Sequence, residues 1–185
     1  MDLVLVHPEI PHNTGCAARL SAALGLRLHL VEPLGFSLED RYLKRAGLDY
    51  WPLVDLVVHA DWPALVAHLE QGSAREIAAR LRLFSARGGT SLFETAFEAD
   101  DVLVFGSETR GLPSELLTQH AARRVYVPIR SGVRSLNLAN TVCLGVYTAL
   151  VRAGVPLPDN DGKYAAHPEA PLDVKPISRV KRVDA

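Results

Sequence analysis

Short apolar runs alternate along most of the chain with longer segments in which apolar residues recur every three or four positions. The short runs end in turn residues, which is typical of strands, and the longer segments have the period of helices. This alternation predicts an α/β fold in which helices flank a largely parallel sheet. The predicted strands are residues 3–6, 28–31, 56–58, 81–84, 102–105 and 125–127.

Capping residues set the limits of the predicted helices. Asn13 or Thr14 can cap a first helix that ends at Gly25. Pro113 suits the first position of a short helix. The remaining predicted helices are residues 37–45, 62–70 and 137–153.

The last predicted helix, residues 137–153, is apolar on nearly every side. We therefore expect it to be buried. Asn137 and Asn140 recur on one face near its start. Buried amides need partners, so we expect these two side chains to be paired.

Proline and glycine interrupt every period from about residue 156 onward. We predict one domain over residues 1–155 and an irregular, Pro-rich tail over residues 156–185. The tail ends in a basic segment that suits phosphate binding, and a dispensable disordered tail is the alternative. The basic residues are Lys175, Arg179, Lys181 and Arg182.

The composition fits a compact protein of 185 residues with a hydrophobic fraction of 48%. The sequence has no apolar run long enough for a membrane span and no basic segment typical of a signal peptide. Cys16 and Cys143 lack the spacing of a metal site or a disulfide framework. We expect a cytoplasmic location.

The chain carries 20 Lys and Arg against 21 Asp and Glu, a net charge of −1 that at first argues against nucleic acid as a partner. The charges are segregated, however. No acidic residue occurs between Leu116 and Pro158. The arginines in that stretch are Arg123, Arg124, Arg130, Arg134 and Arg152.

Three segments combine glycine, proline and polar residues directly after predicted strands. Residues 8–15 read Pro-Glu-Ile-Pro-His-Asn-Thr-Gly and lead into a helix that carries Arg19. Residues 105–113 contain two glycines, which let the backbone approach a bound molecule closely. Residues 127–140 join the last predicted strand to the last helix. Ligands of α/β proteins bind at such strand ends.

Other chemistries fit these segments less well. The glycines of residues 106–111 lack the Lys-Ser/Thr of a phosphate loop, and a dinucleotide fingerprint is missing. Ser107 lacks the context of a nucleophile elbow. His7, Glu9 and His12 straddle two prolines and have no helical pair spacing, so we expect no metal site.

The three segments resemble the three motifs of the SPOUT superfamily of RNA methyltransferases, in its SpoU branch. The resemblance covers residues 1–153 in order and spacing. Residues 8–11, 30–36 and 45–50 are similar to small stand-alone members that methylate the 2′-hydroxyl of the tRNA wobble nucleotide 34. The resemblance implies a deep trefoil knot near the C-terminus that binds S-adenosylmethionine as methyl donor, without a metal. It also implies a homodimer and the anticodon region of tRNA as partner.

The resemblance also implies roles for individual residues. Arg19 and Ser135 match catalytic positions. Because a guanidinium keeps its proton at neutral pH, we expect Arg19 to orient the phosphate and the 2′-hydroxyl. The expected cofactor contacts are Phe84, Gly106, Val127, Ile129, Ser135 and Leu136. The expected supporting residues are Asn13, Glu108, Asn137 and Asn140. The expected RNA contacts are Arg19, Lys44, Arg45 and Arg130.

Three alternatives remain open from the sequence. A SPOUT enzyme could act on another tRNA position or on ribosomal RNA. A catalytically silent RNA-binding module could retain the fold, although it would not need to keep Asn13, Arg19, Ser135 and Asn140. A nucleotide-binding α/β protein without an RNA partner is the third.

Overall fold

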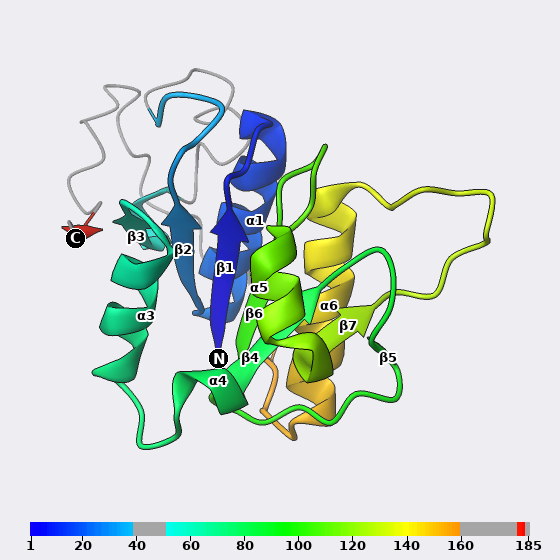
Figure 1. Cartoon of the computed structure of the whole chain (residues 1–185). Coiled ribbons are helices and arrows are strands. Elements are labelled where there is room, and N and C mark those ends of the chain that lie inside the picture. The colour runs from blue at the N-terminus through cyan, green and yellow to red at the C-terminus, as the bar shows by residue number, and fades with distance from the viewer. Residues whose placement is uncertain (39–50, 160–180, 184–185) are drawn as a thin grey trace.

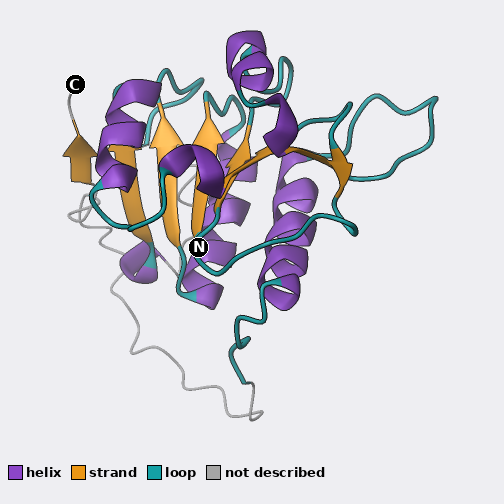
Figure 2. Ribbon diagram, turned by 60° about the horizontal axis from the view of Figure 1, so that its bottom comes forward, coloured by secondary structure: helices purple, strands orange, loops and turns teal. Residues whose placement is uncertain are grey.

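The computed structural model describes residues 1–38, 51–159 and 181–183. Within these residues, eight strands form one sheet in the order β5-β7-β4-β6-β1-β2-β3-β8, and every neighbouring pair is parallel. Helices cover both faces of the sheet, which confirms the predicted α/β fold (Figures 1 and 2). The strands are β1 (Asp2–Val6), β2 (Arg27–Val31), β3 (Asp55–His59), β4 (Leu81–Phe84), β5 (Thr90–Ser91), β6 (Val102–Phe105), β7 (Arg124–Tyr126) and β8 (Lys181–Val183).

The helices agree with the predicted ones over most of the described chain. The helix predicted over 62–70 is confirmed, and the one predicted over 37–45 lies almost entirely outside the described residues. Pro113 precedes the short helix as its cap residue instead of occupying the first helical position. The helices are α1 (Pro11–Leu24), η1 (Trp51–Leu53), α3 (Trp62–Glu70), α4 (Ile77–Arg80), α5 (Ser114–Gln119), η2 (Ala121–Arg123) and α6 (Leu138–Arg152).

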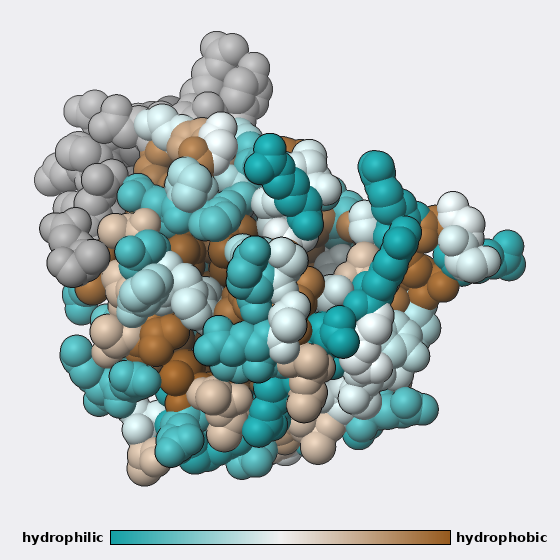
Figure 3. Space-filling view, viewed as in Figure 1, coloured by the Kyte–Doolittle hydropathy of each residue, from teal (hydrophilic) through white to brown (hydrophobic). Residues whose placement is uncertain are grey.

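Successive side chains of the strands point alternately into two hydrophobic cores, one on each face of the sheet. Leu3 and Leu5 of β1 pack in the core that α1 and α6 cover. Val4 and Val6 point to the opposite face, where they pack with residues of α3, α4 and α5. On this second face, hydrophilic side chains are spread between small apolar areas (Figure 3). The sheet is therefore buried on both sides, as parallel sheets are.

Helix α1 begins earlier than predicted. Its cap residue is Ile10, which makes no side-chain capping bond, and Pro11 lies in the first turn. The prediction of Asn13 or Thr14 as the cap was wrong, because both residues lie within the first turns of the helix, where their side chains are buried. The predicted end is confirmed, since Gly25 adopts the left-handed conformation with φ 65° that a residue with a side chain rarely adopts.

Helix α6 is not fully buried, so this expectation was wrong. Leu144, Tyr147 and Val151 are 37%, 41% and 61% exposed. Asn137 and Asn140 are exposed too. The helix is apolar on nearly every side because it has a second apolar face that no described residue of this chain covers.

Strand β8 lies in the segment that the proline content predicted to be irregular, and for these three residues the prediction was wrong. Lys181–Val183 pair with Val57–His59 at the edge of the sheet. The amide of Ala60 also donates to the carbonyl of Val183. Pairing with a distant edge is a tertiary contact, which the local proline pattern does not reveal. None of the helices in the described part of the chain is both long and apolar enough to cross a membrane.

Candidate functional site

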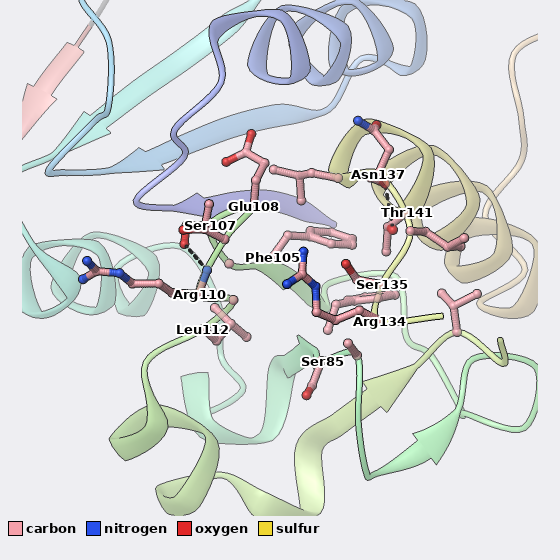
Figure 4. Close-up of a pocket in the computed structure, with 18 of the residues that line it drawn as sticks. Ser85, Phe105, Ser107, Glu108, Arg110, Leu112, Arg134, Ser135, Asn137 and Thr141 are labelled. Carbon is pink, nitrogen blue, oxygen red and sulfur yellow. Dashed lines mark hydrogen bonds between the residues drawn. The ribbon is translucent and has the colours of Figure 1, made fainter. Parts of the chain in front are cut away.

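Four neighbouring strands bring the three motifs to one edge of the sheet. Strands β7, β4, β6 and β1 are adjacent, and all of them point the same way. Their carboxyl ends carry residues 127–137, 85–89, 106–113 and 7–10. A cavity of about 550 Å³ opens between these loops (Figure 4). Cavities of this size hold small molecules in many proteins.

Two aromatic rings form the apolar floor of the cavity. Phe84 and Phe105 stack with ring centroids 4.2 Å apart. Helix α6 packs closely beneath them, because a Cβ atom added to Gly145 would lie 2.8 Å from Phe84 Cε1. Both rings are buried, so the floor suits an uncharged ring.

The loop of the second motif closes tightly on itself. The amide of Gly111 donates to the carbonyl of Ser107 at 2.9 Å, and the amide of Ser107 donates to the carbonyl of Gly111 at 3.2 Å. A Cβ atom on Gly106 would lie 2.1 Å from the backbone of Gly111. Glycine is therefore required at position 106 for this closed loop.

A carboxylate in this loop holds the start of α1. Glu108 accepts hydrogen bonds from the amides of Glu9 and Ile10 at 2.8 and 3.2 Å. Glu9 in turn accepts from the hydroxyl and the amide of Thr109, at 2.7 and 3.2 Å. Glu108 thus takes the place of the side-chain cap that α1 lacks, and the negative charge suits a helix N-terminus.

A chain of asparagines extends this contact to the third motif. Asn13 Nδ2 donates to Glu108 at 2.9 Å, and Asn13 Oδ1 accepts from Asn137 Nδ2 at 3.1 Å. Asn137 Oδ1 accepts from the amide of Asn140 at 3.3 Å and so caps α6. Three segments far apart in the sequence are therefore fixed relative to one another around the cavity.

The structure gathers most of the predicted site residues around the cavity. All the expected cofactor contacts line it, and so do three of the expected supporting residues. Asn140 does not line it. Arg19 and Arg130 are exposed and lie outside the lining, and Lys44 and Arg45 fall outside the described residues. The lining residues among those predicted are Phe84, Gly106, Val127, Ile129, Ser135, Leu136, Asn13, Glu108 and Asn137.

Sequence reasoning assigned no role to three arginines of the lining, Arg87, Arg110 and Arg134. Arg134 lies within the third motif, directly before Ser135. Arg87 follows β4 and precedes two glycines with positive φ, Gly88 and Gly89. The glycine pair shortly after the predicted strand 81–84 was a signal that could have identified residues 85–89 as a fourth loop at the cavity.

Two of the three residues considered for a metal, Glu9 and His12, have other partners. Glu9 is bonded to Thr109, and the ring of His12 lies 3.7 Å from Cys16 Sγ. Among residues 1–38, 51–159 and 181–183, no three His, Cys, Asp or Glu side chains are placed to share a metal ion.

The groups with the clearest pKa shifts lie away from the cavity. His29 Nδ1 and His59 Nε2 are 2.9 Å apart in the core beside β8. Burial, and then the neighbouring His29, lowers the pKa of His59 to about 4. At the amino ends of the strands, Arg82 and Asp101 form a buried ion pair at 3.0 Å. Burial raises the pKa of the Asp101 carboxyl.

Known proteins resemble this chain over the part that builds the cavity. The SpoU rRNA Methylase family matches residues 1–147. A tRNA (cytidine(34)-2′-O)-methyltransferase from Burkholderia ambifaria is 48% identical over 154 residues, which make up 83% of this chain and 96% of that protein.

Solved structures share the fold as well. One, from work on the 2-OH methylation of C/U34 on tRNA, has a TM-score of 0.75 at 47% identity and covers 83% of this chain and 95% of its own. A SpoU methyltransferase from Streptomyces viridochromogenes, solved in complex with AdoMet, has a TM-score of 0.70 at 23% identity. It covers 82% of this chain and 57% of its own, and this likeness concerns the fold.

Proposed function

Because the chain belongs to the SpoU rRNA Methylase family, we propose that it methylates the ribose 2′-hydroxyl of the tRNA wobble nucleotide 34 with S-adenosylmethionine as donor. The observation that carries this proposal is the cavity enclosed by the three motifs. The close relative from Burkholderia ambifaria, named for this reaction, supports the choice of nucleotide. The proposed tRNA substrate supports a cytoplasmic location.

The residues of the cavity fit S-adenosylmethionine. The stacked rings of Phe84 and Phe105 offer an apolar floor for an adenine. Gly106 lines the cavity, and because it has no side chain the loop of the second motif can close against its own backbone beside the bound donor. Val127, Ile129 and Leu136 add apolar lining around this floor. Bound S-adenosylmethionine supplies an activated methyl group, because the sulfur that leaves becomes neutral, and this transfer requires no metal.

The protein has to orient the ribose and hold the loops in register. Ser135 lines the cavity and places a hydroxyl where it can bond the ribose or the donor. The bonds that join Glu108, Asn13 and Asn137 keep the loops from spreading when RNA enters. Holding two reactants in line accelerates transfer by removing their freedom to rotate and diffuse.

A second copy of the chain would complete the site. Arg19, the expected contact to the target ribose, lies outside the cavity of its own chain. The exposed apolar face of α6, with Leu144, Tyr147 and Val151, is suited to packing against another copy. We therefore infer a homodimer in which Arg19 of each chain serves the neighbouring cavity. The likeness to SpoU structures supports a trefoil knot formed by the second and third motifs.

The decisive test incubates purified protein and labelled methyl donor with unmodified total tRNA and, separately, with unmodified ribosomal RNA, followed by nucleoside analysis at mapped positions. We expect a 2′-O-methylated nucleoside at position 34 of some isoacceptors. Methylation confined to another position or to ribosomal RNA would overturn the proposed substrate, and no methylation of any RNA would overturn the enzyme itself.

A variant tests the assignment of Arg19. Arg19→Ala should abolish transfer while S-adenosylhomocysteine still binds, because Arg19 is expected to contact the ribose and phosphate of the RNA and not the cofactor. Loss of cofactor binding in Arg19→Ala would contradict the role in orienting RNA. Analytical ultracentrifugation of the same proteins tests the dimer.

A further inference from the structure

The lining of the cavity carries an excess of positive charge. Arg87 and Arg134 line the cavity, and Arg110 borders it with its guanidinium directed away (Figure 4), whereas Glu108 is the one acid in the lining. The Glu108 carboxylate already accepts three hydrogen bonds from the first motif. Arg134 has no acidic partner among the described residues. The positive charge at the cavity is therefore not balanced by an acidic side chain of the protein, and the cavity suits a bound anion.

The side chains of these arginines differ in direction. The guanidinium of Arg134 points into the cavity, beside Ser135 (Figure 4). The guanidinium of Arg110 points away from the cavity (Figure 4). Arg134 is exposed, whereas the floor residues Phe84 and Phe105 are buried. The charge therefore lies at the open side of the cavity, over an apolar floor.

Resting on the proposed function above, we propose that Arg134 is a positioning residue that binds the RNA phosphate on the 3′ side of the methylated ribose. This phosphate is attached to the sugar carbon next to the one that bears the 2′-hydroxyl. An enzyme that seats the hydroxyl in the cavity therefore brings the phosphate close to the open side, where Arg134 lies. The planar guanidinium can donate two parallel hydrogen bonds to a phosphate.

The methyl donor suits Arg134 less well as the bound group. Its sulfonium is positively charged and would be repelled by a guanidinium held nearby. Its carboxylate is the other anion available, and binding measurements separate the two cases because S-adenosylhomocysteine carries the same carboxylate.

The test compares Arg134→Ala and Arg134→Lys with Arg110→Ala as matched control. Arg110→Ala removes the same charge from the same rim, but its guanidinium points away from the cavity. For Arg134→Ala we expect tRNA affinity to fall about tenfold and S-adenosylhomocysteine affinity to change less than about twofold. The slope of log affinity against log salt should become shallower by about 0.7, the value for one single-stranded phosphate contact.

The two other variants test whether the guanidinium forms two parallel hydrogen bonds with a phosphate. Arg134→Lys should keep the salt slope but recover only part of the affinity, because an ammonium cannot form this parallel pair. Arg110→Ala should bind tRNA like the wild type. In turnover, Arg134→Ala should raise KM for tRNA more than it lowers kcat.

Three outcomes would overturn the inference. Equal losses of tRNA affinity in Arg134→Ala and Arg110→Ala would mean that Arg134 acts only through general electrostatic attraction. A tenfold loss of S-adenosylhomocysteine affinity in Arg134→Ala would mean that Arg134 binds the methyl donor. An unchanged salt slope in Arg134→Ala would exclude the phosphate contact. These binding measurements do not require turnover, so a protein that methylates no RNA refutes the proposed function while they still decide the role of Arg134.

Discussion

Glu108 accepts a hydrogen bond from the side-chain amide of Asn13 at 2.9 Å, although the two residues lie 95 positions apart. The same carboxylate also accepts from two backbone amides, those of Glu9 and Ile10. Asn13 in turn accepts a hydrogen bond from the side-chain amide of Asn137. One acidic side chain therefore positions the first motif against the second and, through Asn13, against the third.

Replacing this carboxylate by an amide should weaken both the fold and the site. In Glu108→Gln, an NH₂ group would face N–H donors, so at least one partly buried donor would lose its partner. We expect the free energy of unfolding to fall by about 1–3 kcal/mol. Methyl transfer should fall more than cofactor binding, because the loops lose their register. Urea unfolding and single-turnover methylation measure the two effects.

Glu115→Gln is the matched control for Glu108→Gln. Glu115 is exposed in the first turn of α5. Its replacement should leave stability within about 0.5 kcal/mol of the wild type. Equal effects of the two substitutions would show that the bonds of Glu108 contribute nothing specific.

Adding one methyl group under the floor of the cavity should disturb the cofactor site. In Gly145→Ala, the new Cβ atom would lie 2.8 Å from Phe84 Cε1 and 3.2 Å from Phe105 Cζ. Overpacking of this kind costs about 1–3 kcal/mol. The displaced rings should also weaken S-adenosylhomocysteine binding, which calorimetry measures. Gly72→Ala is the control, since its nearest non-neighbouring atom is 3.9 Å away.

The buried ion pair at the opposite edge of the sheet should respond strongly to loss of one partner. Asp101→Asn would leave the buried guanidinium of Arg82 without its counter-charge, at a cost of about 3–5 kcal/mol. Asp55→Asn removes an exposed partner of Arg27 and should cost less than about 1 kcal/mol. Thermal unfolding of both variants measures the difference. Equal shifts would contradict the role of burial.

Acidification should destabilise the protein through His59. The folded state lowers its pKa to about 4 from the ordinary 6.5, so the unfolded chain binds more protons between these values. The contribution of His59 to stability is therefore complete above about pH 6.5 and declines as the pH falls toward 4. Unfolding measured at closely spaced pH values should show this decline, and His59→Gln should reduce it. An identical decline in the variant would assign the effect to other groups.

Much of the framework could be predicted from local patterns. Each predicted strand lies within one residue of the observed one, because buried parallel strands are apolar runs with sharp ends. The predicted lining residues were implied by the resemblance to the SpoU branch, and all of them except Phe84 lie in the three motifs. Arg134 lies within the third motif but was assigned no role in the site, since its direction depends on the folded loop.

The errors share a physical cause. The start of α1 depends on Glu108, almost a hundred positions away, and not on a local cap. Strand β8 depends on the free edge of β3. The exposed side of α6 looks like core in the sequence because apolar periodicity does not say which molecule covers a face.

The position of β6 in the sheet has a consequence for synthesis on the ribosome. Strand β6 lies between β1 and β4, yet it follows both in the chain. Until it emerges, β1 has a free edge that can pair with other chains. Translation at about 5–20 residues per second leaves that edge open for seconds. Nascent chains therefore need protection until residues 102–105 have joined the two halves.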